Sequence, residues 1–174
     1  MDKVTVTIDG ITLEVPSNYT VLQACREAGI DIPTLCYAEG INEIGSCRLC
    51  VVEIDGVKNL AASCIYPVQN GMNIRTNTPR VREARRVNLE LILSNHDRNC
   101  LTCIRNGKCE LQDLAERFGI TEIEFQGENV NYPLDDASPA IVRNPNKCVL
   151  CRRCIAECQE VQNVFAIGAV NRGF

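Results

Sequence analysis

The fold is decided first by residues 4–15, which read VTVTIDGITLEV. Apolar residues alternate with polar ones on both sides of Asp9-Gly10, a dipeptide that favours the two-residue turn of a β-hairpin. Pairing across that turn puts the apolar side chains of both arms on one face. The expected cross-strand pairs are Ile8 with Ile11, Val6 with Leu13, and Val4 with Val15. The stretch therefore predicts a hairpin with one buried face.

Sequence signals after the hairpin predict a short helix and further strands. Thr20 and Gln23 have the spacing of a capping box, and Gly29 follows where a helix would end. Residues 21–28 are therefore expected to form a helix that packs on the hairpin. Cys25 falls on the inner face of this helix and is interpreted as a small core residue. Further strands are expected at residues 51–54, 57–62 and 72–76.

Two longer helices and an extended segment are expected after these strands. Apolar residues recur at helical spacing over 79–95 and again over 110–118. On the first helix we expect four residues to face inward: Val81, Ala84, Val87 and Leu91. We expect four others to face largely outward: Arg80, Arg82, Arg85 and Arg86. Residues 121–146 contain three prolines among polar residues and are interpreted as an extended linker or arm.

The composition excludes several classes of protein. The chain has 174 residues, of which 12 are cysteine, 18 are basic and 22 are acidic, so its net charge is −4. Its start lacks the pattern of a signal peptide, and no apolar run is long enough to span a membrane. We therefore expect a cytoplasmic protein, in a reducing compartment where clustered cysteines bind metal more often than they form disulfides. The acidic balance gives no reason to expect binding to nucleic acid or membrane.

Eleven of the cysteines fall into three runs, each within one of the expected structural units. The runs are Cys36-x10-Cys47-x2-Cys50-x13-Cys64, His96-x3-Cys100-x2-Cys103-x5-Cys109, and Cys148-x2-Cys151-x2-Cys154-x3-Cys158. A Cys-x2-Cys step lets two thiolates face one metal or one cluster edge from a single turn. The first run lacks the plant-type 2Fe-2S spacing, so its residues alone leave a zinc site or buried free thiols open.

The third run has the spacing of the 4Fe-4S signature of bacterial ferredoxins. Cys148, Cys151 and Cys154 are expected to hold three corners of such a cluster. Cys158 leaves three alternatives open, because Gln159 follows it where a proline is usual and no cysteine occurs later. Either Cys158 completes the cluster, or the fourth ligand lies on another chain, or this chain is a truncated relative of a longer one.

In this order and spacing, the three runs resemble the N-terminal electron-transfer region of one protein family. The family comprises the large iron–sulfur subunit of respiratory complex I, FeFe hydrogenases and some NAD(P)-linked formate dehydrogenases. The resemblance covers essentially the whole chain. Residues 145–154 (PNKCVLCRRC) and 171–174 (NRGF) look most like the clostridial, anaerobic branch of hydrogenases and formate dehydrogenases.

This resemblance implies an α+β fold with three cluster-binding parts. The implied parts are a β-grasp 2Fe-2S ferredoxin domain at 1–78, a helical 4Fe-4S domain at 79–120, the linker at 121–146, and a ferredoxin-like 4Fe-4S unit, complete or truncated, at 147–174. The implied ligands of the 2Fe-2S cluster are Cys36, Cys47, Cys50 and Cys64. Those of the first 4Fe-4S cluster are His96, Cys100, Cys103 and Cys109. Those of the second are Cys148, Cys151, Cys154 and Cys158.

The function that the resemblance implies is that of an iron–sulfur electron-transfer subunit. Its implied partners are a flavoprotein subunit that oxidises NAD(P)H, a catalytic subunit of a hydrogenase or formate dehydrogenase, and a ferredoxin. The sequence has no Gly-x-Gly dinucleotide fingerprint and no nucleophilic Ser/His/Asp set, so we expect no catalytic site in this chain. The alternatives are a zinc-stapled interaction module, an iron–sulfur redox sensor, and the detached wire region of a single-chain enzyme.

Overall fold

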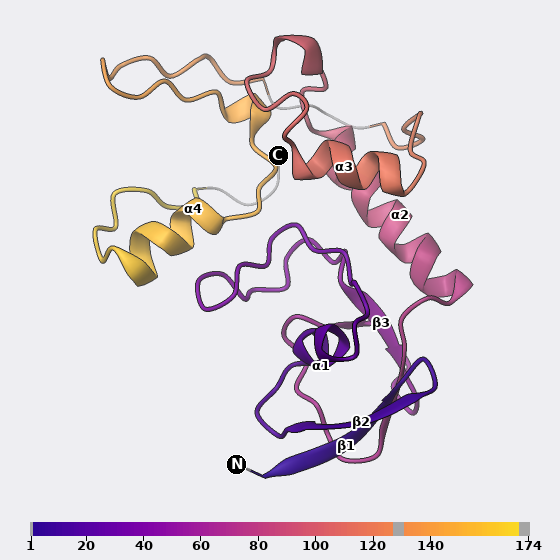
Figure 1. Cartoon of the computed structure of the whole chain (residues 1–174). Coiled ribbons are helices and arrows are strands. Elements are labelled where there is room, and N and C mark those ends of the chain that lie inside the picture. Colours follow the sequence, from indigo (N-terminus) through magenta and orange to yellow (C-terminus); the bar gives the residue numbers. More distant parts are fainter. Residues whose placement is uncertain (1, 127–130, 171–174) are drawn as a thin grey trace. The chain divides into compact units, whose positions relative to one another are not determined.

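The computed structural model describes residues 2–126 and 131–170 and contains both helices and strands (Figure 1). The strands are β1 (Lys3–Ile8), β2 (Ile11–Pro16), β3 (Val51–Ile54), β4 (Ala61–Ala62) and β5 (Met72–Arg75). The helices are α1 (Val21–Glu27), α2 (Pro79–Ser94), α3 (Glu110–Arg117) and α4 (Arg153–Ala156), with further helical turns η1 (Cys100–Thr102), η2 (Pro145–Lys147) and η3 (Glu157–Val161). The chain divides into two compact units after Asn88. In the described part of the chain, no helix is long and apolar enough to cross a membrane. The NRGF stretch at 171–174 lies outside the described residues.

A five-stranded sheet in the order β2-β1-β5-β3-β4 forms the frame of the first unit. Neighbouring strands are antiparallel except β1 and β5, which run parallel. The hairpin of β1 and β2 is confirmed in the predicted register, with Ile8 opposite Ile11 and Val6 opposite Leu13. Val6, Ile8 and Val15 are fully buried, whereas Ile11, beside the turn, is half exposed.

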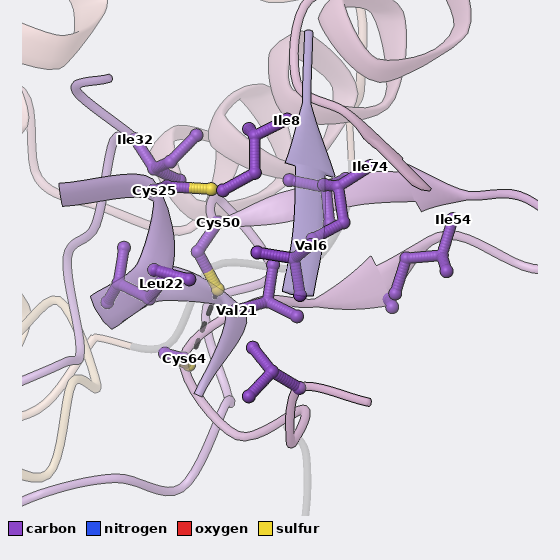
Figure 2. Close-up of a cluster of buried hydrophobic side chains, with 14 of the residues drawn as sticks. Val6, Ile8, Val21, Leu22, Cys25, Ile32, Cys50, Ile54, Cys64 and Ile74 are labelled. Carbon is purple, nitrogen blue, oxygen red and sulfur yellow. Dashed lines mark hydrogen bonds between the residues drawn. The ribbon is translucent and has the colours of Figure 1, made fainter. Parts of the chain in front are cut away.

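Helix α1 forms where the capping signal predicts it and packs in the core of the first unit. The Thr20 hydroxyl accepts a hydrogen bond from the Gln23 N–H (3.3 Å), and the Gln23 side chain accepts one from the Thr20 N–H (2.8 Å). The chain leaves the helix at Gly29, whose φ of +74° is costly for residues with a Cβ. Figure 2 shows Cys25 among buried side chains such as Ile8. The predicted core role of Cys25 is therefore confirmed.

The second predicted hairpin is shorter than the sequence pattern suggests. Strand β3 forms over its predicted range, but β4 comprises two residues instead of the whole of 57–62. Residues 55–59 are exposed, so no apolar packing holds them in an extended conformation against β3. The other edge of β3 pairs with β5, the strand predicted at 72–76, through Ile54 and Ile74.

Helix α2 has nearly its predicted length, but two of its side chains contradict the expected orientation. Arg85, expected to face outward, is 7% exposed and donates from Nε (3.2 Å) and Nη2 (2.8 Å) to the Val51 carbonyl oxygen. Leu91, expected to face inward, is 49% exposed. The buried residues of the helix include a row spaced four apart: Val81, Arg85, Leu89 and Leu93. An arginine can occupy this row because the β3 carbonyl accepts its hydrogen bonds.

The second unit contains α3 and longer irregular segments. Leu111 and Leu114 are buried on α3, which ends before Gly119 as predicted. Within the segment predicted as a linker or arm, Asp135 and Arg143 exchange two backbone hydrogen bonds (2.9 and 2.8 Å) in an isolated antiparallel bridge. The chain between these two residues therefore folds back on itself.

Replacing Arg85 with alanine is expected to destabilise the chain, because the Val51 carbonyl loses its charged donor. Hydrogen bonds to charged groups contribute about 1.5 to 3 kcal/mol, which for a chain of this size corresponds to a fall in Tm of roughly 3 to 12 °C. Thermal unfolding of the full chain, followed by circular dichroism without oxygen, measures this shift. Arg82→Ala is the matched control, because Arg82 is exposed and bonds to nearby Asn77. Equal Tm values for the two variants would contradict the role given to Arg85.

Candidate metal centres

The thiols of the first run lie in loops around the sheet and meet in two pairs. Cys36 follows α1 in the chain, Cys47 and Cys50 precede β3, and Cys64 follows β4. The Cys47 N–H donates to Cys36 Sγ (3.5 Å), and a hydrogen bond joins Cys50 Sγ to Cys64 Sγ (3.3 Å; Figure 2). Three of these cysteines are at most 1% exposed, and Cys47 is half-buried. The loops thus bring thiols that are distant in the sequence into contact and shield them from water.

Polar side chains other than the cysteines hold these loops in place. Asn42 is 2% exposed and donates from Nδ2 to the Cys36 carbonyl oxygen (2.7 Å). Arg48, inside the Cys-x2-Cys step, has a left-handed φ of +56°, and Asn88 of α2 donates from Nδ2 to its carbonyl oxygen (3.0 Å). A left-handed backbone costs a residue with a side chain about 1 to 3 kcal/mol. The surrounding hydrogen bonds therefore hold a turn that would otherwise relax.

Gly45 allows the loop before Cys47 to approach the residue after Cys64. Its φ is +61°, and a Cβ at this position would lie 2.8 Å from Cδ1 of Ile65. A larger residue would therefore have both a strained backbone and a steric clash. The close contact with Ile65 places apolar surface beside the thiols of the first run.

The hydrogen bonds within the two thiol pairs favour negative charge on sulfur. The hydrogen bond with Cys47 lowers the pKa of Cys36 to about 5, and the hydrogen bond with Cys64 lowers the pKa of Cys50 to about 6. The same bonds, together with burial, raise the pKa values of Cys47 and Cys64. Each pair thus readily gives up one proton, which is the first step towards the thiolates that bind iron. By contrast, burial raises the pKa of Cys25 to about 12, so this thiol stays neutral.

The four residues of the second run line one pocket of the second unit. The pocket has a volume of about 180 Å³ and lies between the end of α2 and the start of α3. Its candidate ligands are His96, Cys100, Cys103 and Cys109. Leu93 and Leu111 add apolar walls. Cys109 is the N-cap residue of α3, and its side chain makes no capping hydrogen bond. Its sulfur is therefore available to bind a metal centre in the pocket.

His96 is placed as a neutral ligand would be. Burial, followed by the nearby positive charge of Lys147, lowers the pKa of the imidazole and favours its neutral form. The ring makes a hydrogen bond to the Cys148 backbone, while Nδ1 is buried without a hydrogen-bond partner. Histidine ligands usually donate one ring N–H to a carbonyl and present the other nitrogen to the metal. The surroundings of His96 fit that pattern.

Gln112 of α3 closes the loop that carries Cys103 and Cys109. Its Oε1 accepts a hydrogen bond from the Gly107 N–H (3.1 Å), and its Nε2 donates to Asn106 Oδ1 (2.9 Å). Gly107 has a φ of +73°, which allows the tight turn between the two cysteines. The helix therefore fixes the loop through one side chain.

The third run lies on short turns with more exposed thiols. Cys148 and Cys154 are exposed, whereas Cys151 and Cys158 are half-buried. The Leu150 N–H points at Cys148 Sγ (3.4 Å), and Leu150 has a left-handed φ of +56°. Cys158 Sγ accepts a hydrogen bond from the Ala166 N–H (3.2 Å). The backbone thus directs N–H groups at the first and last sulfurs of the run.

The thiols of the first set meet in pairs and the second set lines one pocket, but neither set meets at a single point. Within residues 2–126 and 131–170, no three His, Cys, Asp or Glu side chains are placed to hold one metal ion. In a 4Fe-4S cluster each ligand binds a different iron atom, and in a 2Fe-2S cluster two ligands bind each iron, so four ligand atoms need not converge on one point. The supporting residues Asn42, Asn88 and Gln112 were not singled out from the sequence, because isolated polar residues in loops and helices have no distinguishing pattern.

Two family models match the units that contain the first and second donor sets. Residues 1–79 match the model of a 2Fe-2S iron-sulfur cluster binding domain. Residues 85–124 match the model of the NADH-ubiquinone oxidoreductase-G iron-sulfur binding region. A 2Fe-2S domain and a 4Fe-4S binding region are therefore present.

Curated relatives match nearly the whole chain. The NADP-reducing hydrogenase subunit HndD of Solidesulfovibrio fructosivorans is 48% identical over 179 residues, covering 100% of this chain and 31% of the relative. An NADH-quinone oxidoreductase G subunit of Rhizobium meliloti is 41% identical over 170 residues, covering 97% of this chain and 20% of the relative. The chain thus spans less than a third of the length of these relatives.

A solved structure agrees with both results. The crystal structure of an NAD⁺-reducing NiFe hydrogenase in the H2-reduced state has a TM-score of 0.89 at 32% identity, covering 98% of this chain and 71% of that chain. These matches confirm the resemblance drawn from the cysteine spacing. The chain therefore belongs to the iron–sulfur protein family that includes the G subunits of NADH-quinone oxidoreductases and the hydrogenase protein HndD.

Proposed function

We propose that this chain holds one 2Fe-2S and two 4Fe-4S clusters and relays single electrons through them. The pocket of the second unit carries the proposal, because every candidate ligand between residues 96 and 109 lines it. The first and third runs each provide a further donor set within their own loops. The family membership supports the same reading, since both named relatives are subunits of redox enzymes.

At the first site, the two thiol pairs suit the two irons of a 2Fe-2S cluster. Cys36 and Cys47 would bind one iron, and Cys50 and Cys64 would bind the other. The mixed sheet with α1 packed in its core is, in this proposal, a β-grasp ferredoxin domain. The strand order and the parallel pairing of β1 with β5 support this assignment.

At the other two sites, we assign four ligands each to a 4Fe-4S cluster. The second set is His96, Cys100, Cys103 and Cys109. The third set is Cys148, Cys151, Cys154 and Cys158. The assignment of Cys158 adopts the alternative in which this residue completes the third cluster. The hydrogen bond from the Ala166 N–H supports it, because donation to sulfur stabilises the thiolate form.

When bound, each cluster supplies a centre that takes up or gives up one electron. The residues of the chain hold the thiolates, exclude water at the first site and direct N–H groups at sulfur. Cys36, Cys50 and Cys64 are at most 1% exposed, so the charge change on electron transfer takes place away from solvent. Both burial and N–H donation set the reduction potential of a cluster. The three sites differ in burial, so we expect them to differ in potential.

In this proposal the chain passes electrons between two kinds of partner. One is a flavoprotein subunit that oxidises NAD(P)H, and the other is a hydrogenase catalytic subunit, a formate dehydrogenase catalytic subunit or a ferredoxin. The printed names of the relatives, an NADP-reducing hydrogenase subunit and an NADH-quinone oxidoreductase subunit, support the first partner and the hydrogenase. Formate dehydrogenase stays a prediction from the sequence at 145–154. We propose a cytoplasmic location, with catalysis carried out by the partners.

The full chain, purified without oxygen, is expected to contain about ten iron atoms and as many sulfides. Cys47→Ser should lower the iron content by about two atoms and remove the 2Fe-2S signal from the EPR spectrum, because one iron loses a thiolate. Cys25→Ala is the matched control, since Cys25 is a buried cysteine of the same unit that belongs to no candidate ligand set. It should retain all the iron. A wild-type chain that contains zinc and neither iron nor sulfide would overturn the proposed function.

His96→Cys is expected to retain the second cluster and to lower its midpoint potential. The physical reason is that a thiolate adds a negative charge where the neutral imidazole adds none, so the reduced state is less stable. A redox titration followed by low-temperature EPR measures the shift. The signals of the other two clusters serve as internal controls and should titrate as in the wild type. Loss of all three signals would contradict the independence of the sites.

A further inference from the structure

The second unit contains contacts that join the surroundings of the second and third ligand sets. Each contact links a residue next to a ligand of one set with a residue next to a ligand of the other. Asp97 and Glu110 follow His96 and Cys109 in the chain. Their partners, Lys147 and Arg153, precede Cys148 and Cys154. The pattern therefore concerns the two sites rather than the general stability of the unit.

Lys147 is the first of these links. Its ammonium group lies 2.8 Å from Asp97 Oδ2 and donates to the carbonyl oxygens of Asp97 (3.1 Å) and Asn99 (2.9 Å). The Lys147 side chain is 18% exposed, which is low for a lysine. All three donors of the ammonium group are thus used by the loop between His96 and Cys100.

Arg153 is the second link. Both terminal nitrogens of its guanidinium group donate to the two carboxylate oxygens of Glu110, and the Nη1 to Oε1 distance is 2.9 Å. This fork arrangement fixes direction as well as distance, which a single ion pair does not. The guanidinium group lowers the pKa of Glu110, so the carboxylate stays charged.

Backbone hydrogen bonds also join the surroundings of the second and third ligand sets. The Asp97 N–H donates to the carbonyl oxygen of Asn146 (3.2 Å), and the His96 ring makes a hydrogen bond to the Cys148 backbone. Asn146 is itself held by two hydrogen bonds with the backbone of Tyr132. The segment before the third ligand set is therefore tied to the segment around His96 at several points.

We propose that the Lys147–Asp97 and Arg153–Glu110 pairs set the separation of the second and third clusters. The four residues are then positioning residues for electron transfer between these clusters. The inference rests on the proposed function, because it requires both clusters to be present. Electron tunnelling slows steeply with distance, so a relay needs a fixed gap between neighbouring centres. Each ion pair lies beside a different ligand of each set. Two such pairs fix the distance more firmly than one pair, because the two segments could rotate about a single pair.

A charge-swap experiment on the full chain with its clusters tests the proposal. The readout is the magnetic coupling between the second and third clusters when both are reduced, measured as line broadening and faster spin relaxation by EPR. Arg153→Glu and Glu110→Arg should each weaken this coupling, since two like charges then face each other. The double variant carrying both changes should restore it, because the pair forms again with its charges exchanged. A merely stabilising surface pair would not move the coupling.

Matched controls come from the ion pair between Arg143 and Asp135, which is also exposed but contacts neither ligand set (3.5 Å). Arg143→Glu should leave the coupling and the iron content unchanged. Unchanged coupling in Arg153→Glu, with all iron retained, would overturn the inference. If the reversed charges cause loss of iron, Glu110→Gln and Asp97→Asn replace them, and full wild-type coupling in both would overturn it equally. Absence of iron from the wild-type chain would instead overturn the proposed function.

Discussion

The sulfur atoms of Cys50 and Cys64 lie 3.3 Å apart, and this proximity is the constraint on which the first unit depends. Two thiolates at such a distance repel each other by a few kcal/mol in a partly buried site, by roughly 4 kcal/mol at 4 Å for an effective dielectric constant of 20. The chain avoids this repulsion by sharing a proton within the pair. An iron cation bound by both thiolates would offset this repulsion.

The loops of the first and third runs share a local backbone feature. In the first and third runs, a residue with left-handed backbone lies just after a candidate ligand, at Arg48, or two positions after one, at Leu150. In both loops the N–H of the residue two positions after the ligand points at its sulfur, as Leu49 does for Cys47 and Leu150 for Cys148. The backbone cost is met by contacts elsewhere, such as the bond from Asn88 to the Arg48 carbonyl. The two loops therefore share a backbone conformation as well as the Cys-x2-Cys spacing.

The elements and candidate ligands could be predicted because they depend on short-range patterns. The Asp9-Gly10 turn fixes the register of the first hairpin, and the capping box fixes the start of α1. The inward position of Arg85 could not be predicted, since it depends on the Val51 carbonyl of β3, which lies 34 residues earlier in the chain. The short β4 has a similar cause: the segment before it has no buried face, and a turn signal does not reveal that.

The candidate ligands could be predicted because they follow short-range spacing, whereas the residues that support them depend on contacts between distant parts of the chain. Spacing within a run determines which thiols can face one cluster, so the sequence alone separates the three sets. The sequence contains no information on the distance between the second and third sets. In the proposed arrangement that distance depends on contacts such as the one from Arg153 to Glu110, 43 residues apart. Both residues are nonetheless direct neighbours of ligands. A charged residue beside a ligand cysteine is therefore a useful starting point when the supports of a cluster site are sought, provided a structure shows its partner.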